Sequence, residues 1–176
     1  HSGKFNKEPS VIFAFQKAID FIFIIVNFVF ISTVVVHELG HFGSARFFDC
    51  SYSRIVYESG LPHTELLCGS DDSFNHAMTV IIGILTPIVI SFFFFFSGGT
   101  FMRELGILII GFGLMISYRD FLELGFTSVF SLFISIVGFI AVVFAVGFLI
   151  SSRAQEEQFI AFTEGHKSFN RRGIKN

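Results

Sequence analysis

The sequence has little charge, few cysteines and few prolines. Only 15% of its 176 residues are charged, and it contains 3 Pro, 2 Cys and no Trp. Two cysteines are too few for a disulfide-rich secreted scaffold. The 12 basic residues against 14 acidic ones exclude a strongly basic surface, so no nucleic-acid partner is expected. The low charge and the high apolar content also exclude a disordered chain.

The sequence is instead rich in apolar residues. Hydrophobic residues make up 52% of the chain, and 28 of its residues are Phe. A soluble domain of this size has too much surface to hide so many apolar side chains from water. Residues 1–176 are therefore predicted to form a single membrane domain that spans the lipid bilayer.

Four apolar segments are the candidate membrane spans. They cover residues 19–36, 77–96, 105–116 (extended by its flanks) and 126–150. A run of about 18 or more apolar residues is typical of a helix that crosses a hydrocarbon core of about 30 Å. The runs are continuously apolar and do not alternate as barrel strands do. The prediction is an all-α polytopic membrane protein with about four transmembrane helices.

The basic residues are distributed unevenly between the two sides of the membrane that four spans would define. Arg46, Arg54 and Arg119 lie on the side opposite the termini. The other nine lie on the side of the termini: Lys4, Lys7, Lys17, Arg103, Arg153, Lys167, Arg171, Arg172 and Lys175. Because cytoplasmic segments carry the excess of Lys and Arg, both termini are predicted to be cytoplasmic in a multi-pass protein of the cell membrane. No small-residue cleavage site follows the first apolar run, so no cleavable signal is expected.

Two polar segments accompany the spans. Residues 43–75 form a polar loop in which Tyr52–Tyr57 and His63–Cys68 have the composition of a small hairpin. Cys50 and Cys68 flank this hairpin, and the sequence leaves open whether they pair in an oxidising compartment or remain buried thiols. Residues 151–176 are expected to be a solvated, basic tail.

One motif carries metal chemistry. His37-Glu38-Leu39-Gly40-His41 is an HExxH motif that continues the first apolar run. Residues four apart share one face of a helix, so both imidazoles can reach one Zn²⁺ ion. Glu38 is placed to act as general base toward a water molecule. The alternative is a pair of structural histidines, but ionisable groups at membrane depth normally mark function.

A third ligand must come from the same side of the membrane as His37 and His41. The third span ends on that side, at Asp120, and Glu123 one helical turn later is the main competitor. His63, Glu65 and His76 also lie on that side and are expected to be ordinary loop residues.

The motif resembles a known family. His37-Glu38-Leu39-Gly40-His41-Phe42, followed by Ala45-Arg46 and then Cys50 and Arg54, is similar to the first motif of the site-2 protease family of intramembrane zinc metalloproteases. The resemblance implies a catalytic three-helix core, over residues 19–123 here, with an aspartate ligand on its third helix. It favours Asp120 over Glu123, although Phe121 follows Asp120 where the family has Gly. It also implies a metal nearer the cytosolic face, whereas the charge sorting implies the outer face.

The expected function is hydrolysis of transmembrane segments of other membrane proteins, with His37, His41 and Asp120 holding Zn²⁺. Pro87 and Gly83 in the second span are candidates for opening a cleft beside the metal. An edge strand of the hairpin is a candidate for holding the substrate extended. The alternative is a membrane zinc-binding protein without activity, either a carrier or a degenerate protease. The oligomeric state stays open.

Overall fold

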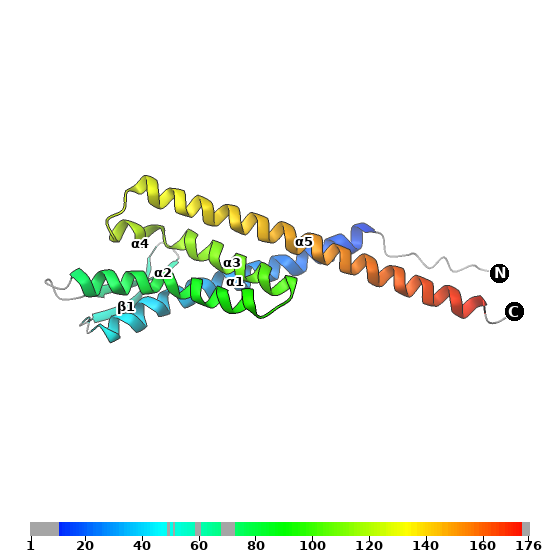
Figure 1. The fold of residues 1–176 in the computed structure, drawn as a ribbon, viewed down its shortest axis with the longest axis horizontal. Coiled ribbons are helices and arrows are strands. Elements are labelled where there is room, and N and C mark those ends of the chain that lie inside the picture. Colours follow the sequence, from blue (N-terminus) through cyan, green and yellow to red (C-terminus); the bar gives the residue numbers. More distant parts are fainter. Residues whose placement is uncertain (1–10, 49, 51, 59–60, 68–72, 174–176) are drawn as a thin grey trace.

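The protein is an elongated helical bundle in a computed structural model that describes residues 11–48, 50, 52–58, 61–67 and 73–173. The elements in chain order are α1 (Val11–Phe47), β1 (Tyr52–Glu58), β2 (Leu61–Leu67), α2 (Ser73–Phe96), α3 (Thr100–Ile116), α4 (Tyr118–Glu123) and α5 (Ser128–Gly173). The start of α1 and the end of α5 lie at one end of the bundle, and the hairpin and α4 lie at the other (Figure 1).

The all-α membrane architecture predicted from the sequence is confirmed, and three helices among the described residues are long and apolar enough to span a membrane. These are residues 15–47 of α1, the whole of α2, and residues 128–156 of α5. The segment expected as the third of four spans is shorter: α3 has 17 residues and rises about 25 Å, less than the hydrocarbon thickness of about 30 Å.

The outer surface of the bundle is apolar. Side chains such as Phe23, Phe28 and Phe93 are 68%, 71% and 74% exposed along the candidate spans. In water, so large an exposed apolar surface would drive association, whereas lipid tails solvate it. The apolar exterior therefore agrees with insertion into a bilayer.

The bundle interior joins α1, α3 and α5. Its core consists of Ile22, Val29, Leu108, Phe112, Ala145 and Leu149. Two glycines allow α3 and α5 to pack closely, because a Cβ atom on Gly138 would lie 2.5 Å from the Gly111 carbonyl oxygen. Small residues at such crossings let helix backbones approach in membranes.

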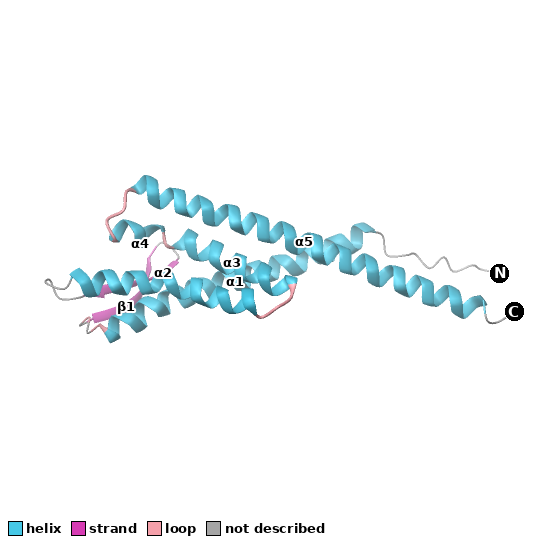
Figure 2. Ribbon diagram, in the orientation of Figure 1, coloured by secondary structure: helices cyan, strands magenta, loops and turns pink. Residues whose placement is uncertain are grey.

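Both polar segments, residues 43–75 and 151–176, contain regular secondary structure. The expected hairpin is an antiparallel pair in which Arg54 faces Glu65 and Val56 faces His63 in register, and it lies at the end of the bundle far from the termini (Figure 2). The segment predicted as a polar tail, residues 151–176, contains the last part of α5, which runs for 46 residues to Gly173.

Candidate metal centre

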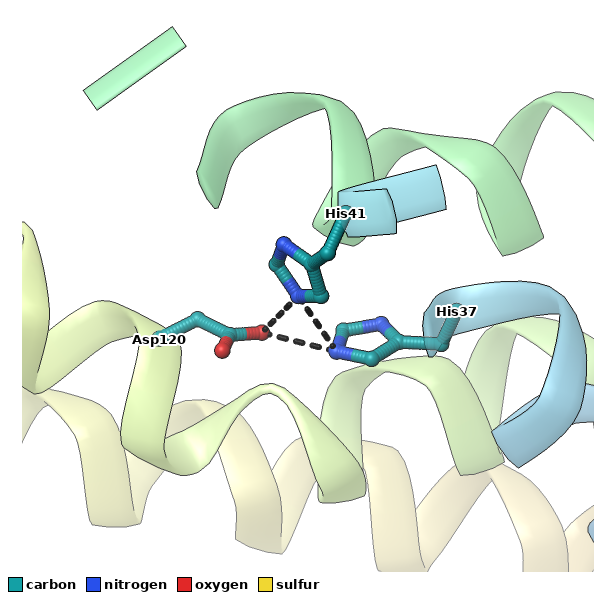
Figure 3. A group of neighbouring side chains, drawn as sticks. All are labelled: His37, His41 and Asp120. Atoms are coloured by element: carbon teal, nitrogen blue, oxygen red, sulfur yellow. Dashed lines mark hydrogen bonds and ion pairs between the residues drawn. The ribbon is translucent and has the colours of Figure 1, made fainter. Parts of the chain in front are cut away.

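Three titratable side chains converge at the end of the bundle away from the termini. His37 and His41 lie on the same face of α1, are 3% and 4% exposed, and point toward Asp120 on α4 (Figure 3). Asp120 Oδ2 lies 2.9 Å from His37 Nε2 and 3.5 Å from His41 Nε2. The two Nε2 atoms are 3.1 Å apart. One ligand atom from each residue is thus directed at a common point.

The spacing of these atoms fits a small divalent cation. Donor atoms about 2.0–2.1 Å from one tetrahedral zinc ion lie about 3.3 Å from one another, close to the three observed separations. Asp120 Oδ2 is buried and pairs with both imidazoles, and it has no further hydrogen-bond partner among the described residues. A cation among these three atoms would bind the oxygen and both nitrogens at once.

The charge state of Asp120 suits a ligand. Burial alone would raise the pKa of its carboxyl group, but the neighbouring imidazoles of His37 and His41 outweigh that effect and hold the pKa below its usual range. Asp120 is therefore a carboxylate at neutral pH.

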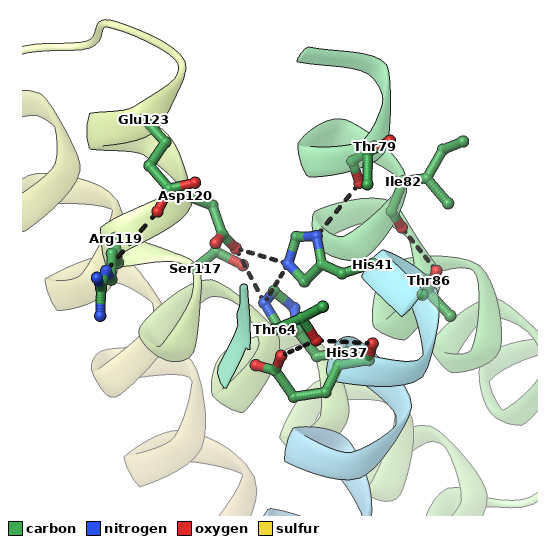
Figure 4. A network of polar contacts seen from close by, with 12 residues as sticks. His37, His41, Thr64, Thr79, Ile82, Thr86, Ser117, Arg119, Asp120 and Glu123 are labelled. Carbon is green, nitrogen blue, oxygen red and sulfur yellow. Dashed lines mark hydrogen bonds and ion pairs between the residues drawn. The ribbon is translucent and has the colours of Figure 1, made fainter. Parts of the chain in front are cut away.

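The orientation of His41 is fixed from α2. His41 Nδ1 lies 3.2 Å from the carbonyl oxygen of Thr79, to which it donates a hydrogen bond (Figure 4). This contact uses Nδ1, so Nε2 is the ring nitrogen that faces His37 and Asp120 and the one that a metal ion would bind. Thr79 is fully buried, so water does not compete for this carbonyl oxygen.

A close approach of α1 and α2 makes room for that ring. A Cβ atom on Gly83 would lie 2.1–2.3 Å from three ring atoms of His41, and a Cβ atom on Gly40 would lie 3.1 Å from Gly83 Cα. The His41 imidazole thus occupies the space that any larger residue at position 83 would fill. Pro87, in contrast, is fully buried and faces α3, where a Cβ atom on Gly113 would lie 3.1 Å from it.

Glu38 is buried beside the histidines and is bound by the hairpin. Its side chain is 8% exposed. Thr64 on β2 donates a hydrogen bond of 2.7 Å to Glu38 Oε2, and its hydroxyl also lies 3.3 Å from the Glu38 carbonyl oxygen. The hydrogen bond fixes one carboxylate oxygen, while the other oxygen keeps its capacity to accept a proton.

The competing ligand candidates lie elsewhere. Glu123 Oε1 is 3.7 Å from Arg119 Nε (Figure 4). Glu123 Oε2 is 3.9 Å from His76 Nε2. Glu123 is therefore paired with two side chains outside the cluster. Position 63 and position 65 lie in β2. Cys50 is held in a disulfide, and Cys68 lies outside the described residues.

Three contributors have no signal in the sequence. Thr79 acts through its backbone carbonyl, Thr64 reaches Glu38 from 26 positions away, and Gly83 matters only because another helix crosses there. The role of Gly83 in making room for His41 can be recognised only once it is known that α2 packs against α1.

Gly83→Ala tests whether the close approach seats His41. The added methyl group should push the imidazole away from Asp120 and weaken binding of Co²⁺, a spectroscopic probe for nitrogen and oxygen ligands, by about tenfold or more. Gly43→Ala is the matched control, because a Cβ atom there meets nothing within 4 Å. Equal Co²⁺ affinity of the Gly83→Ala and Gly43→Ala variants, read from visible absorption titrations, would contradict the argument.

Comparison with protein-family models, with curated proteins and with solved structures finds no match to this chain. A functional assignment therefore depends on the chemistry of its own residues.

Proposed function

We propose that this chain is an intramembrane zinc metalloprotease that hydrolyses peptide bonds in or near the transmembrane segments of other membrane proteins. The main supporting observation is that ligand atoms of His37, His41 and Asp120 meet inside the bundle, with Glu38 next to His37 in the sequence and also buried. The resemblance of the HExxH segment to the site-2 protease family supports the same assignment.

The donor set favours zinc. Two imidazole nitrogens and one carboxylate oxygen leave a fourth tetrahedral position for water, which is the arrangement of catalytic zinc sites. Bound there, the ion would supply a Lewis acid that polarises a carbonyl oxygen and lowers the pKa of water toward 7.

Glu38 has the role of moving a proton. Its carboxylate takes a proton from the attacking water as the new bond to the peptide carbonyl carbon forms. It then returns that proton to the amine nitrogen as the carbon–nitrogen bond breaks, so the carboxylate is regenerated. Thr64 holds Glu38 Oε2 in place for both transfers.

The substrate is proposed to be a transmembrane protein or peptide, because the cluster is built into helices whose outer faces are apolar. A helical substrate must unwind locally, since its carbonyl groups are otherwise bonded within the helix. The β1–β2 hairpin lies next to Glu38 and is suited to hold an unwound segment by adding a strand.

We further propose that the metal end faces the extracytoplasmic side of the cell membrane and that both termini are cytoplasmic. The nine-to-three sorting of Lys and Arg supports this orientation. The disulfide state of Cys50, which directly follows α1 at the metal end, also supports it. Disulfides persist in oxidising compartments and are rare in the cytosol.

Glu38→Gln is the sharpest test of proteolysis. The amide is nearly isosteric but cannot take up a proton, so cleavage of transmembrane peptides should fall by about 10²-fold or more while the zinc content stays unchanged. Undiminished cleavage would contradict the protease proposal. Zinc binding by wild-type protein that cleaves none of a panel of membrane peptides would favour the alternative, a membrane zinc-binding protein without activity.

The ligand set is tested by paired carboxylate variants. Asp120→Asn should reduce the zinc bound per mole of purified protein strongly, because it replaces an anionic ligand by a neutral amide. His37→Ala or His41→Ala should do the same, because each removes a donor nitrogen. Glu123→Gln should leave zinc nearly unchanged, because Glu123 pairs with Arg119 and His76. Loss of zinc in Glu123→Gln with retention in Asp120→Asn would reverse the assignment.

Orientation is tested with topology reporters. A reporter inserted after Gly60 should give the extracytoplasmic signal, and one fused after Asn176 should give the cytoplasmic signal. The opposite pair of signals would place the metal end in the cytoplasm.

A further inference from the structure

A polar pocket lies between the start of α3 and the middle of α5, away from the metal centre. It has a volume of about 270 Å³ and is lined by Phe101, Glu104, Leu149, Ser152, Arg153 and Glu156. These residues come from the first turns of α3 and from the part of α5 where the apolar span ends at residue 156. The pocket therefore lies at the level where hydrocarbon gives way to lipid head groups.

Glu104 gives the pocket a buried acceptor. Its side chain is 4% exposed, and its Oε1 accepts a hydrogen bond of 3.0 Å from Ser152 Oγ. Its Oε2 is buried without a hydrogen-bond partner among the described residues. A buried carboxylate oxygen without a donor is costly, so a donor group from outside the chain would be stabilising there.

Arg153 gives the same pocket a cationic rim. Its Nη1 donates a hydrogen bond of 2.6 Å to Glu156 Oε2, and its guanidinium carbon lies 4.6 Å above the ring of Phe21 on α1. A guanidinium group has five donors, so the bond to Glu156 leaves capacity for a phosphate oxygen. The pocket thus combines the buried Glu104 carboxyl group with a partly exposed ion pair of Arg153 and Glu156.

The pocket is too large for a single ion as its ligand, and it adjoins an apolar groove. About 270 Å³ is roughly nine times the share of one water molecule in the liquid, about 30 Å³. Phe101 also lines a neighbouring groove of about 320 Å³ whose other walls are mostly apolar residues of α1, α2 and α3, among them Ile25, Ile90 and Leu105. A polar pocket that shares a wall with an apolar groove matches an amphipathic molecule.

We propose that this pocket binds a phospholipid with a primary ammonium head group of the ethanolamine type. The ammonium group donates to Glu104 Oε2, the phosphate accepts from Arg153, and an acyl chain follows the apolar groove past Phe101. The lining carries two carboxyl groups, Glu104 and Glu156, and one guanidinium group, so its charge favours the ammonium end of the lipid, while the donors of Arg153 that Glu156 does not use bind the phosphate. This site is separate from the proposed zinc centre and does not depend on it.

The test compares lipids that differ only at nitrogen. The purified protein is mixed with phosphatidylethanolamine and phosphatidylcholine of identical acyl chains, and the lipid retained is measured by native mass spectrometry. Wild type should prefer phosphatidylethanolamine by about tenfold, which corresponds to about 1.4 kcal/mol, because a quaternary ammonium group has no hydrogen to donate. Phosphatidylglycerol, which lacks the ammonium group, should bind no better than phosphatidylcholine.

Glu104→Gln should abolish this preference, because the amide loses the charge that selects an ammonium group. Asp20→Asn is the matched control, since it removes a negative charge from an exposed position on α1 outside the pocket. Equal retention of the two lipids by wild type would overturn the proposal without any variant, so a folding defect in Glu104→Gln does not block the test. A competition experiment gives a second test. If a transmembrane peptide with a flanking lysine displaces bound phosphatidylcholine and phosphatidylethanolamine does not, the pocket binds a protein segment and the lipid proposal is wrong.

Discussion

The buried cluster of His37, His41 and Asp120 is the constraint around which this end of the bundle is organised. In an apolar bundle, polar groups must find their partners inside the protein because lipid supplies none. The surrounding backbone is shaped accordingly. Gly83 admits the His41 ring between α1 and α2. At Ser117, whose hydroxyl donates to the Gly113 carbonyl, α3 ends and the chain turns into the short helix α4, which carries Asp120 to the histidines. Helix packing and helix termination thus serve the same three side chains.

The sequence predicts much of this arrangement through two simple rules. The helical membrane fold follows from the length of the apolar runs, and the pairing of His37 with His41 follows from the helical repeat. The proximity of Asp120 follows from counting spans, because the chain returns to the same side after an even number of further crossings. The length of α3 does not follow, since its flanks end at a glycine turn and at Ser117 and leave only 17 helical residues. The continuation of α5 to Gly173 does not follow from the apolar pattern either, because a polar sequence can be helical without one.

Long-range contacts account for the rest of what the sequence does not predict. Thr79 binds His41 across 38 positions through a backbone atom that every residue possesses. Gly83 was interpreted together with Pro87 as a means of opening a cleft, yet the glycine accommodates an imidazole and the proline packs against α3. Both roles depend on how closely α2 crosses its neighbours. Composition and periodicity specify which face of a helix is apolar, but they carry no information on the distance between two helix axes.

The contact between Thr64 and Glu38 connects the hairpin to the proposed chemistry. A carboxylate that acts as a base must be held in one orientation while keeping an oxygen that can take up a proton. Thr64 meets both needs, because its hydroxyl binds only Oε2 of the side chain and also approaches the Glu38 backbone. β2 is held by β1 along its whole length, from the pair of Tyr52 with Leu67 to the pair of Glu58 with Leu61. Thr64 is therefore part of a two-stranded unit, and a shift of that unit against α1 would change the hydrogen bond that orients Glu38. Within the proposed function, a substrate strand added to the hairpin would act on the base through this single hydrogen bond.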